Sequence, residues 1–343
     1  MGNTAQGFRF LLIAASLVVV IAGLRAAAPI ALPFALSLLL AILSLPLLLW
    51  LQDKRVPTPL AVLLTVLANI VCLGAIVLIV GGSVESFTRE APKYADRLQQ
   101  MNAALLAWLQ SKGIEVSPEI ARDVINPGRA MAFVGQMFNS LASVLSNFVL
   151  VIITTIFILF EITQFPQKLR LVLDRQDSDS DMFTKIIVDV QRYLGIKTLI
   201  SLATGILIGV WVAILGVDFP ILWGLLAFLF NYIPNLGSIL AAVPTLLLAL
   251  VQLGPGAAAL VGLGYLTVNM VLGTFVEPYF MGRKLGLSTL VIFLSLVFWG
   301  WVWGPVGMLL SVPLTMVVKI LLENSENFRW VAVLLAPTPA QDG

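Results

Sequence analysis

The residues best suited to bind a ligand lie in the stretch FNYIPNLG, at positions 230–237, in the middle of a long apolar run. Asn231 and Asn235 carry amides that donate and accept hydrogen bonds, whereas Pro234 and Gly237 interrupt helical geometry. FPILWGLLAFL precedes the stretch and SILAAVPTLLLAL follows it. Backbone groups freed from a helix, together with two amides, predict hydrogen bonds to a polar ligand. The alternative is a kink that only lets helices pack.

A second break of similar composition, WGWVWGPVG, interrupts another apolar run at residues 299–307. GSILAAVPT and GMLLSVPLT, in the first and second break respectively, each place a proline (Pro244 or Pro313) six or seven residues after a glycine. Two matched breaks favour a binding site over a packing kink, because irregular backbone at membrane depth is tolerated where it is buried in protein or lines a cavity.

The chain lacks the residues that common catalytic and metal-binding sites require. The chain has no histidine and one cysteine, Cys72, which excludes Ser-His and Cys-His catalysis, histidine metal sites and an intrachain disulfide. DRQDSDSD, at 174–181, resembles the start of a calcium loop, but Met182 stands where glycine is required and Val188 where a glutamate is required. We therefore expect a solvated loop that caps a helix over 182–194, and we predict no enzyme, no cofactor and no metal.

The composition predicts a lipid environment for the elements that position these residues. The chain has 343 residues, of which 59% are hydrophobic and 11% charged, whereas a soluble domain is ~45–50% apolar and ~25% charged. The excess of apolar surface predicts an integral membrane protein. The net charge of +2 comes from scattered basic residues, so no nucleic-acid surface is expected.

Apolar stretches, charge-free except for Arg25 in the first, predict the spans along the chain. Two spans occupy residues 10–51, joined near 25–33, and a third and a fourth cover 60–82 and 142–160. Residues 83–140 carry six basic and six acidic residues and a helical apolar pattern, which predicts a water-facing helical subdomain. Charge-free regions then lie at 198–216, 219–253, 257–276 and 285–318. The predicted segments are 1–82 (N-terminal spans), 83–140 (water-facing subdomain), 141–197 (span and cytoplasmic helix), 198–322 (transport core) and 323–343 (tail).

The two broken regions are too long for one span. As a single helix, 219–253 would be ~50 Å long, whereas the bilayer core is ~30 Å thick. Each break leaves two half-length helices, which indicates re-entrant hairpins. A span with an outside hairpin, then a span with an inside hairpin, forms an inverted repeat, as recurs in secondary transporters. We predict an all-α polytopic membrane protein with about six full transmembrane helices, two re-entrant or broken helical hairpins and a small extramembrane helical subdomain.

Basic residues orient this arrangement. With the N-terminus inside, Lys54 lies inside and residues 83–140 lie outside. A hairpin at 219–253 that returns to the outside lets the next span cross inward, which brings Arg283 and Lys284 inside, as the positive-inside rule prefers. We therefore expect both termini to be cytoplasmic.

The sequence resembles a known family at these motifs. FNYIPNLGSILAAVPTLLLAL, VEPYFMGRKLGLSTLVIFLSL and WGPVGMLLSVPL are similar to the signature of the autoinducer-2 exporter family of bacterial membrane proteins. The resemblance implies a multi-pass transporter of the bacterial inner membrane that moves by an elevator-like mechanism and assembles as a homopentamer. Some members export the quorum-sensing signal autoinducer-2 (AI-2), and others are described as sodium or lithium/proton antiporters. Carried over by motif, the candidate substrate-binding residues are Asn231, Tyr232, Pro234, Asn235, Gly237, Pro305 and Gly307, and the candidate gating or hinge residues are Pro244, Glu277, Pro278, Gly282, Arg283 and Pro313.

Glu277 separates the two leading functions. A cation/proton antiporter normally has a buried carboxylate, and only Glu161, Asp218 and Glu277 lie near span ends. Glu277 is interpreted either as a gate or coupling group, or as a headgroup-level residue paired with Arg283 or Lys284. The charge-free core favours export or facilitated passage of a small polar solute, with sodium(lithium)/proton exchange as the alternative. An intramembrane enzyme and a scaffold are weaker hypotheses, because the catalytic motifs are missing and a scaffold needs no paired breaks.

Overall fold

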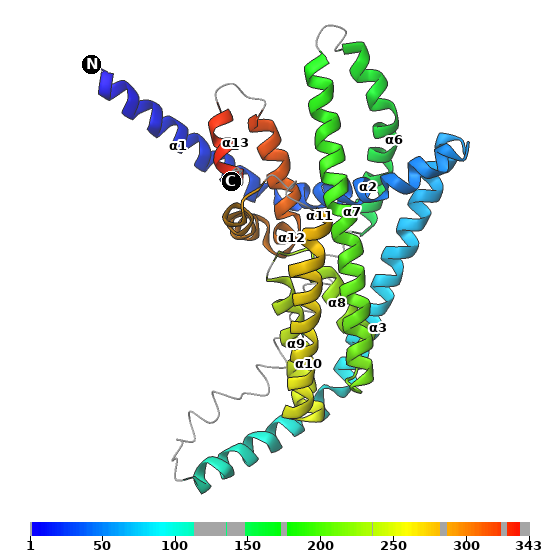
Figure 1. Cartoon of the computed structure of the whole chain (residues 1–343), viewed down its shortest axis with the longest axis vertical. Coiled ribbons are helices and arrows are strands. Elements are labelled where there is room, and N and C mark those ends of the chain that lie inside the picture. Colours follow the sequence, from blue (N-terminus) through cyan, green and yellow to red (C-terminus); the bar gives the residue numbers. More distant parts are fainter. Residues whose placement is uncertain are drawn as a thin grey trace, which may run out of the picture. The chain divides into compact units, whose positions relative to one another are not determined.

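The computed structural model describes residues 2–112, 135, 148–172, 177–234, 236–281, 287–323 and 328–336, and it is helical throughout, with no strand among them (Figure 1). For residues 2–11, 13, 14, 105, 163–172, 177–187 and 281, only the backbone is described. The helices are α1 Gly2–Ala26, α2 Ala28–Asp53, α3 Thr58–Ser111, α6 Phe148–Val172, α7 Asp177–Ile214, α8 Pro220–Phe230, α9 Gly237–Leu253, α10 Pro255–Val268, the π-helix η1 Asn269–Val276, α11 Glu277–Met281, α12 Thr289–Glu323 and α13 Arg329–Leu335.

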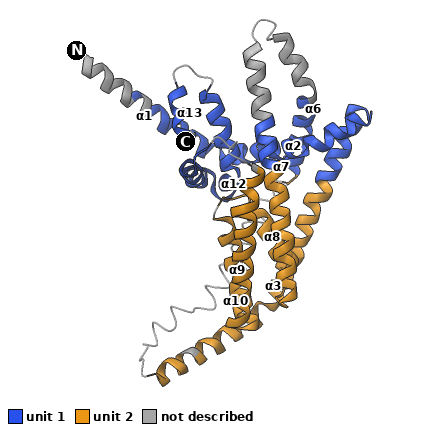
Figure 2. Cartoon of the chain, viewed as in Figure 1, with its two compact units in different colours: residues 1–69, 149–194, 284–343 blue, residues 70–148, 195–283 orange. Residues whose placement is uncertain are grey.

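The chain divides into two compact units, each described by itself (Figure 2). Unit 1 comprises Met1–Asn69, Val149–Leu194 and Lys284–Gly343, and unit 2 comprises Ile70–Phe148 and Gly195–Arg283. The long helices α3 and α7 contribute residues to both units. All of α8, α9, α10, η1 and α11 belong to unit 2.

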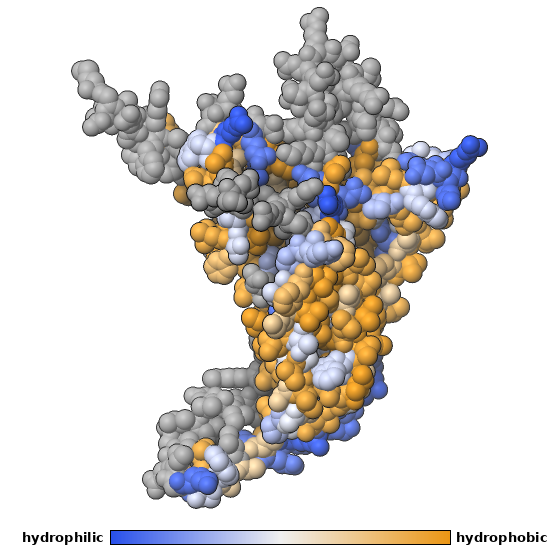
Figure 3. Space-filling model, in the orientation of Figure 1, coloured by the Kyte–Doolittle hydropathy of each residue, from blue (hydrophilic) through white to orange (hydrophobic). Residues whose placement is uncertain are grey.

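Five helical stretches are long and apolar enough to cross a membrane. In unit 2, large apolar side chains stay exposed along α7 and α10, among them Leu199, Val210, Leu263 and Leu266 (Figure 3). Six full spans are not confirmed: the described apolar parts of α1 and α6 cover only Ala15–Ala26 and Phe148–Ile162. The five stretches are Ala28–Asp53, Thr58–Ser111, Val188–Ile214, Pro255–Phe280 and Thr289–Glu323.

One predicted helix boundary is wrong, and one pair of predicted segments forms a single helix. The span at 60–82 and the amphipathic helix after it form one helix, α3, which continues through Pro92. The loop expected over 174–181 is helical from Asp177 onward, and the helix begun there continues to Ile214. Aspartates at 177, 179 and 181 lie in its first turns, where the positive end of the helix dipole favours acidic residues. The boundary between α1 and α2 at Ala27 agrees with the predicted joint.

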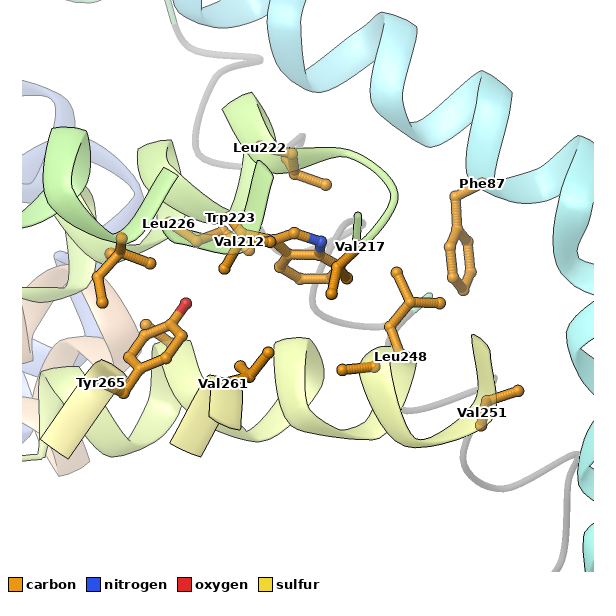
Figure 4. Packing of buried hydrophobic residues seen from close by; sticks show 14 of the residues in the cluster. Phe87, Val212, Val217, Leu222, Trp223, Leu226, Leu248, Val251, Val261 and Tyr265 are labelled. Carbon is orange, nitrogen blue, oxygen red and sulfur yellow. The ribbon is translucent and has the colours of Figure 1, made fainter. Parts of the chain in front are cut away.

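The core of unit 2 lies between α7 and α8 on one side and α9 and α10 on the other. Trp223 is fully buried, and Figure 4 shows it among side chains that face one another from the two sides. Val212 and Leu226 come from one side, and Leu248 and Val261 come from the other. Burial of these apolar side chains, each worth ~1.5–3 kcal/mol, keeps the four helices packed as one body.

Candidate functional site

The FNYIPNLG stretch forms a tight turn between α8 and α9. The Ile233 amide donates to the Phe230 carbonyl at 2.8 Å, and the Leu236 amide donates to the Pro234 carbonyl at 2.6 Å. A side chain at Gly237 would overlap the Phe230 carbonyl, so only glycine fits where α9 starts. The break predicted from the sequence is confirmed, and the chain turns back on itself there.

A polar cluster joins this turn to α7. The Asn231 amide donates from Nδ2 to the Ser201 hydroxyl at 2.9 Å, and the hydroxyls of Thr198 and Tyr232 lie 2.6 Å apart. Ser201 is fully buried, and Tyr232 is buried with its ring edge-on to Phe228. The two predicted binding residues therefore meet hydroxyl groups inside unit 2.

A buried ion pair lies beside the cluster. Lys197 Nζ is 2.7 and 2.8 Å from the two carboxylate oxygens of Glu277. Only 4% of the Lys197 side chain and 22% of the Glu277 side chain are exposed. Lys197 precedes Thr198 and lies one helical turn before Ser201, so α7 supplies three polar groups at one end of its apolar stretch. The partner found for Glu277 is therefore Lys197 on α7, whereas the sequence suggested Arg283 or Lys284.

Glycines bring α8, and with it the turn, close to α7. A side-chain carbon at Gly224 would lie 2.6 Å from the Gly205 carbonyl oxygen, closer than real side-chain carbons come, and 3.2 Å from Gly209 Cα, which is a tight contact. Gly205 and Gly209 are four residues apart and share a helix face, which is the small-residue spacing that lets membrane helices touch. The contact places the end of α8 beside Ser201.

Polar contacts also join the other helices of unit 2 to one another. The hydroxyls of Thr245 on α9 and Tyr265 on α10 lie 3.0 Å apart. Trp211 on α7 donates to the Leu260 carbonyl at 3.0 Å, and its ring occupies the space beside Gly264. Between α10 and Glu277 lies the π-helix η1, a wider helix type often found at functional sites.

At the end away from the turn, the loop before α8 and the end of α9 are held together by hydrogen bonds. The Tyr94 hydroxyl donates to the Asp218 carboxylate at 2.7 Å, and Arg97 donates to the Gln252 carbonyl. Gln252 in turn accepts from the Asp218 amide at 2.9 Å and donates to the Gly216 carbonyl at 3.2 Å. The loop before α8 and the end of α9 therefore lie side by side, both tied to the amphipathic part of α3.

The second predicted break lies in unit 1. Gly304 has φ 65° and ψ −150°, a conformation open essentially only to glycine, and it divides α12 into two helical parts. A side chain at Gly307 would overlap the Trp299 carbonyl. The Trp299 indole donates to the Thr315 hydroxyl at 3.1 Å, which a straight helix could not allow over 16 residues. The break is confirmed at the predicted position.

The remaining predicted residues fall into three groups. Pro244 is buried in α9, Pro278 is exposed in α11, and Pro313 is buried in α12. Pro305 directly follows Gly304 in unit 1, so the candidate residues of the two breaks belong to different units. Outside the described residues lie Asn235, Gly282 and Arg283.

Sequence reasoning missed the α7 contribution, namely Lys197, Thr198 and Ser201. Thr198 and Ser201 stand at the start of the stretch 198–216 that was interpreted as a charge-free span, and Lys197 directly precedes it. Lys197 and Ser201 are four residues apart, which places them on one helix face. That spacing could have identified a polar stripe on this helix.

The arrangement can bind through neutral groups. Two hydroxyls, a phenol and an amide provide donors and acceptors, and the adjacent ion pair carries no net charge. Among the described residues, the Asn231 side-chain oxygen accepts no hydrogen bond. These groups suit hydrogen bonds to a small polar solute.

Long apolar helices around a polar cluster at a helix break define a multi-pass helical membrane protein of the transporter type. The chain belongs to the AI-2E transporter family, whose model matches residues 14–327. Its relatives are similar over nearly their full length. The AI-2 transport protein TqsA of Escherichia coli K12 is 41% identical over 335 residues, which cover 97% of each chain. A putative transport protein of Haemophilus influenzae is 39% identical over 342 residues, which cover 98% of each. The putative transport protein YhhT of E. coli K12 is 37% identical over 331 residues, covering 96% of this chain and 95% of YhhT.

Proposed function

We propose that the protein moves a small, polar, uncharged solute across the membrane and leaves it chemically unchanged. The observation that carries this proposal is the cluster of Thr198, Ser201, Asn231 and Tyr232 at the backbone break of an apolar helical unit, in which Ser201 and Tyr232 are buried and the other two side chains are partly buried. Polar groups within membrane helices are expensive to bury and commonly mark a substrate pathway. AI-2 is the first solute to test, because the relative TqsA is named an AI-2 transport protein.

The α8–α9 pair is proposed as a re-entrant hairpin. With 11 and 17 residues, α8 and α9 reach ~16 and ~26 Å, less than the ~30 Å bilayer core. The contacts of Gln252 with Asp218 and Gly216 support this proposal, since they hold both ends of the hairpin together. The break at Gly304 would be the tip of a second hairpin, related to the first as an inverted repeat.

We also propose the cellular location, the assembly and the transport motion that the family resemblance implies. The protein would reside in the bacterial inner membrane with both termini cytoplasmic, assemble as a homopentamer, and carry the solute by an elevator-like motion. By the same resemblance, the further candidate substrate-binding residues are Pro234, Asn235, Gly237, Pro305 and Gly307, and the candidate hinge or gating residues are Pro244, Glu277, Pro278, Gly282, Arg283 and Pro313.

The test is AI-2 flux in proteoliposomes. The wild-type protein is compared with Asn231→Ala/Asn235→Ala, and with Asn102→Ala in α3 as a control outside the cluster. Loss of two neutral hydrogen bonds, each ~0.5–1.5 kcal/mol, is expected to reduce flux by about tenfold, while the control keeps it.

Two results would count against the proposal. Equal flux in the wild type and the double variant would remove the FNYIPNLG turn from the solute site. No protein-dependent flux from a correctly assembled wild type would exclude AI-2, and sodium-driven proton movement under an imposed pH gradient would then be measured.

A further inference from the structure

The Lys197–Glu277 pair has no evident role in binding an uncharged solute. Both carboxylate oxygens contact the ammonium at 2.7 and 2.8 Å, so each group compensates the charge of the other. Burying two charges is costly, and apolar residues of similar volume are often equally stable in their place. A contribution to stability is therefore a weak explanation for the ion pair. Its position beside the cluster indicates a role in the solute site.

That position gives the pair control over the charge of the site. Lys197 is adjacent to Thr198 in α7 and one turn from Ser201, and these two residues hold Tyr232 and Asn231. In a low-dielectric interior a single uncompensated charge acts strongly over such distances. Without Glu277, the Lys197 ammonium would attract anions to the hydroxyl cluster, and without Lys197 the carboxylate would attract cations.

We propose that the Lys197–Glu277 ion pair sets the charge selectivity of the solute site. The two charges cancel beside the cluster, so the site accepts uncharged polar solutes and rejects both anions and cations. Selectivity then comes from a penalty against charged competitors as well as from hydrogen bonds to the solute. This inference rests on the proposed function of the cluster as the solute site.

Three solutes of one size test the rule: glycerol is uncharged, glycerate is an anion, and 3-amino-1,2-propanediol is a cation at neutral pH. Each is titrated as an inhibitor of AI-2 flux and as a thermal stabiliser of the purified protein. The variants are Glu277→Gln, Lys197→Met and the double variant. The matched controls are Glu323→Gln and Lys319→Met, which break the 2.6 Å ion pair of α12.

The two single variants are expected to favour solutes of opposite charge. Glu277→Gln gains about tenfold in apparent affinity for glycerate, and Lys197→Met gains about tenfold for the amino alcohol. The double variant gains neither, and the α12 controls behave as the wild type. If the ion pair only stabilises the fold, both single variants would bind all three solutes more weakly than the wild type. This result would overturn the proposal.

A second measurement covers single variants that fail to fold, as judged by size-exclusion chromatography in detergent. If the proposal is correct, the wild-type protein binds glycerate and the amino alcohol at least about tenfold more weakly than glycerol. Equal affinity for the three solutes would contradict the proposed charge selectivity. Absence of AI-2 flux in the wild type counts against AI-2 transport alone, because the thermal measurement tests charge selectivity without transport.

Discussion

At the scale of single residues, the FNYIPNLG turn is held against α7 by neutral groups. Asn231 binds Ser201, and Tyr232 binds Thr198, each through a hydrogen bond that neither requires nor leaves a charge. Neutral hydrogen bonds contribute only ~0.5–1.5 kcal/mol each. Such contacts can be exchanged for bonds to a hydroxyl-rich solute at little net cost, which suits a site that must bind and release.

Tyr232→Phe tests this exchange. The variant removes one hydroxyl from the cluster and keeps the ring on Phe228. We expect the KM for AI-2 to rise about fivefold, since a neutral hydrogen bond is worth ~1 kcal/mol, as measured by flux in proteoliposomes.

Tyr265→Phe is the matched control for Tyr232→Phe. It also removes a buried tyrosine hydroxyl of unit 2, but one bound to Thr245 between α9 and α10. It should lower stability by ~1 kcal/mol and leave the KM unchanged. If both variants raised the KM equally, the effect of Tyr232 would reflect packing of the unit rather than the cluster.

At the scale of elements, close backbone contact decides where the turn lies. Gly205 and Gly224 bring α7 and α8 so close that a methyl group on either would lie 2.6–2.7 Å from the carbonyl of the other. The contact leaves α8 beside the polar end of α7. The π-helix η1 then leads from the fixed helix α10 to Glu277, so that the carboxylate meets Lys197.

Gly224→Ala should separate these two helices. The added methyl group must push against backbone atoms, so we expect a loss of ~1–3 kcal/mol in stability and reduced flux, because the turn moves away from Ser201. Stability is measured by thermal unfolding in detergent.

Gly256→Ala, in α10, provides the comparison for Gly224→Ala. A methyl group there meets nothing within 4 Å, and alanine has the better helix propensity by up to ~1 kcal/mol. It should therefore leave stability equal or higher. Equal stability of the two variants would show that α7 and α8 do not need their close approach.

At the scale of the whole molecule, the orientation of the spans decides from which side the turn is reached. In unit 2 the loop before α8 and the end of α9 are tied together by Gln252 and held by Tyr94 and Arg97 of α3. The proposed topology puts this end on the outside, together with the amphipathic part of α3. The turn itself would then lie within the membrane.

Single cysteines in a Cys72→Ser background test this topology. We expect Asp218→Cys, Leu253→Cys and Lys112→Cys to react with a membrane-impermeant maleimide in right-side-out vesicles, and Lys54→Cys to react only in inside-out vesicles. Labelling of positions 218 and 253 from opposite sides would contradict the re-entrant hairpin, because α8 and α9 would then cross the membrane together.

The membrane class and both breaks could be predicted from the amino-acid sequence alone. Hydropathy is a sum over neighbouring residues, and Pro234, Gly237 and Gly304 restrict or free the backbone locally, so both features can be predicted without a fold. Helix continuity was harder, because α3 continues through Pro92 and α7 continues past the charged stretch. Propensity and charge are weak guides where packing can override them.

The contacts between polar residues, in contrast, depend on how the helices pack. Lys197 and Glu277 are 80 residues apart, and Thr198 and Tyr232 are 34 apart. Their contacts depend on the approach of α7 and α8 at Gly205 and on the helices that lead to Glu277. A side chain's partner across a helix bundle is set by the packing of whole elements, and no local pattern in the sequence contains that information.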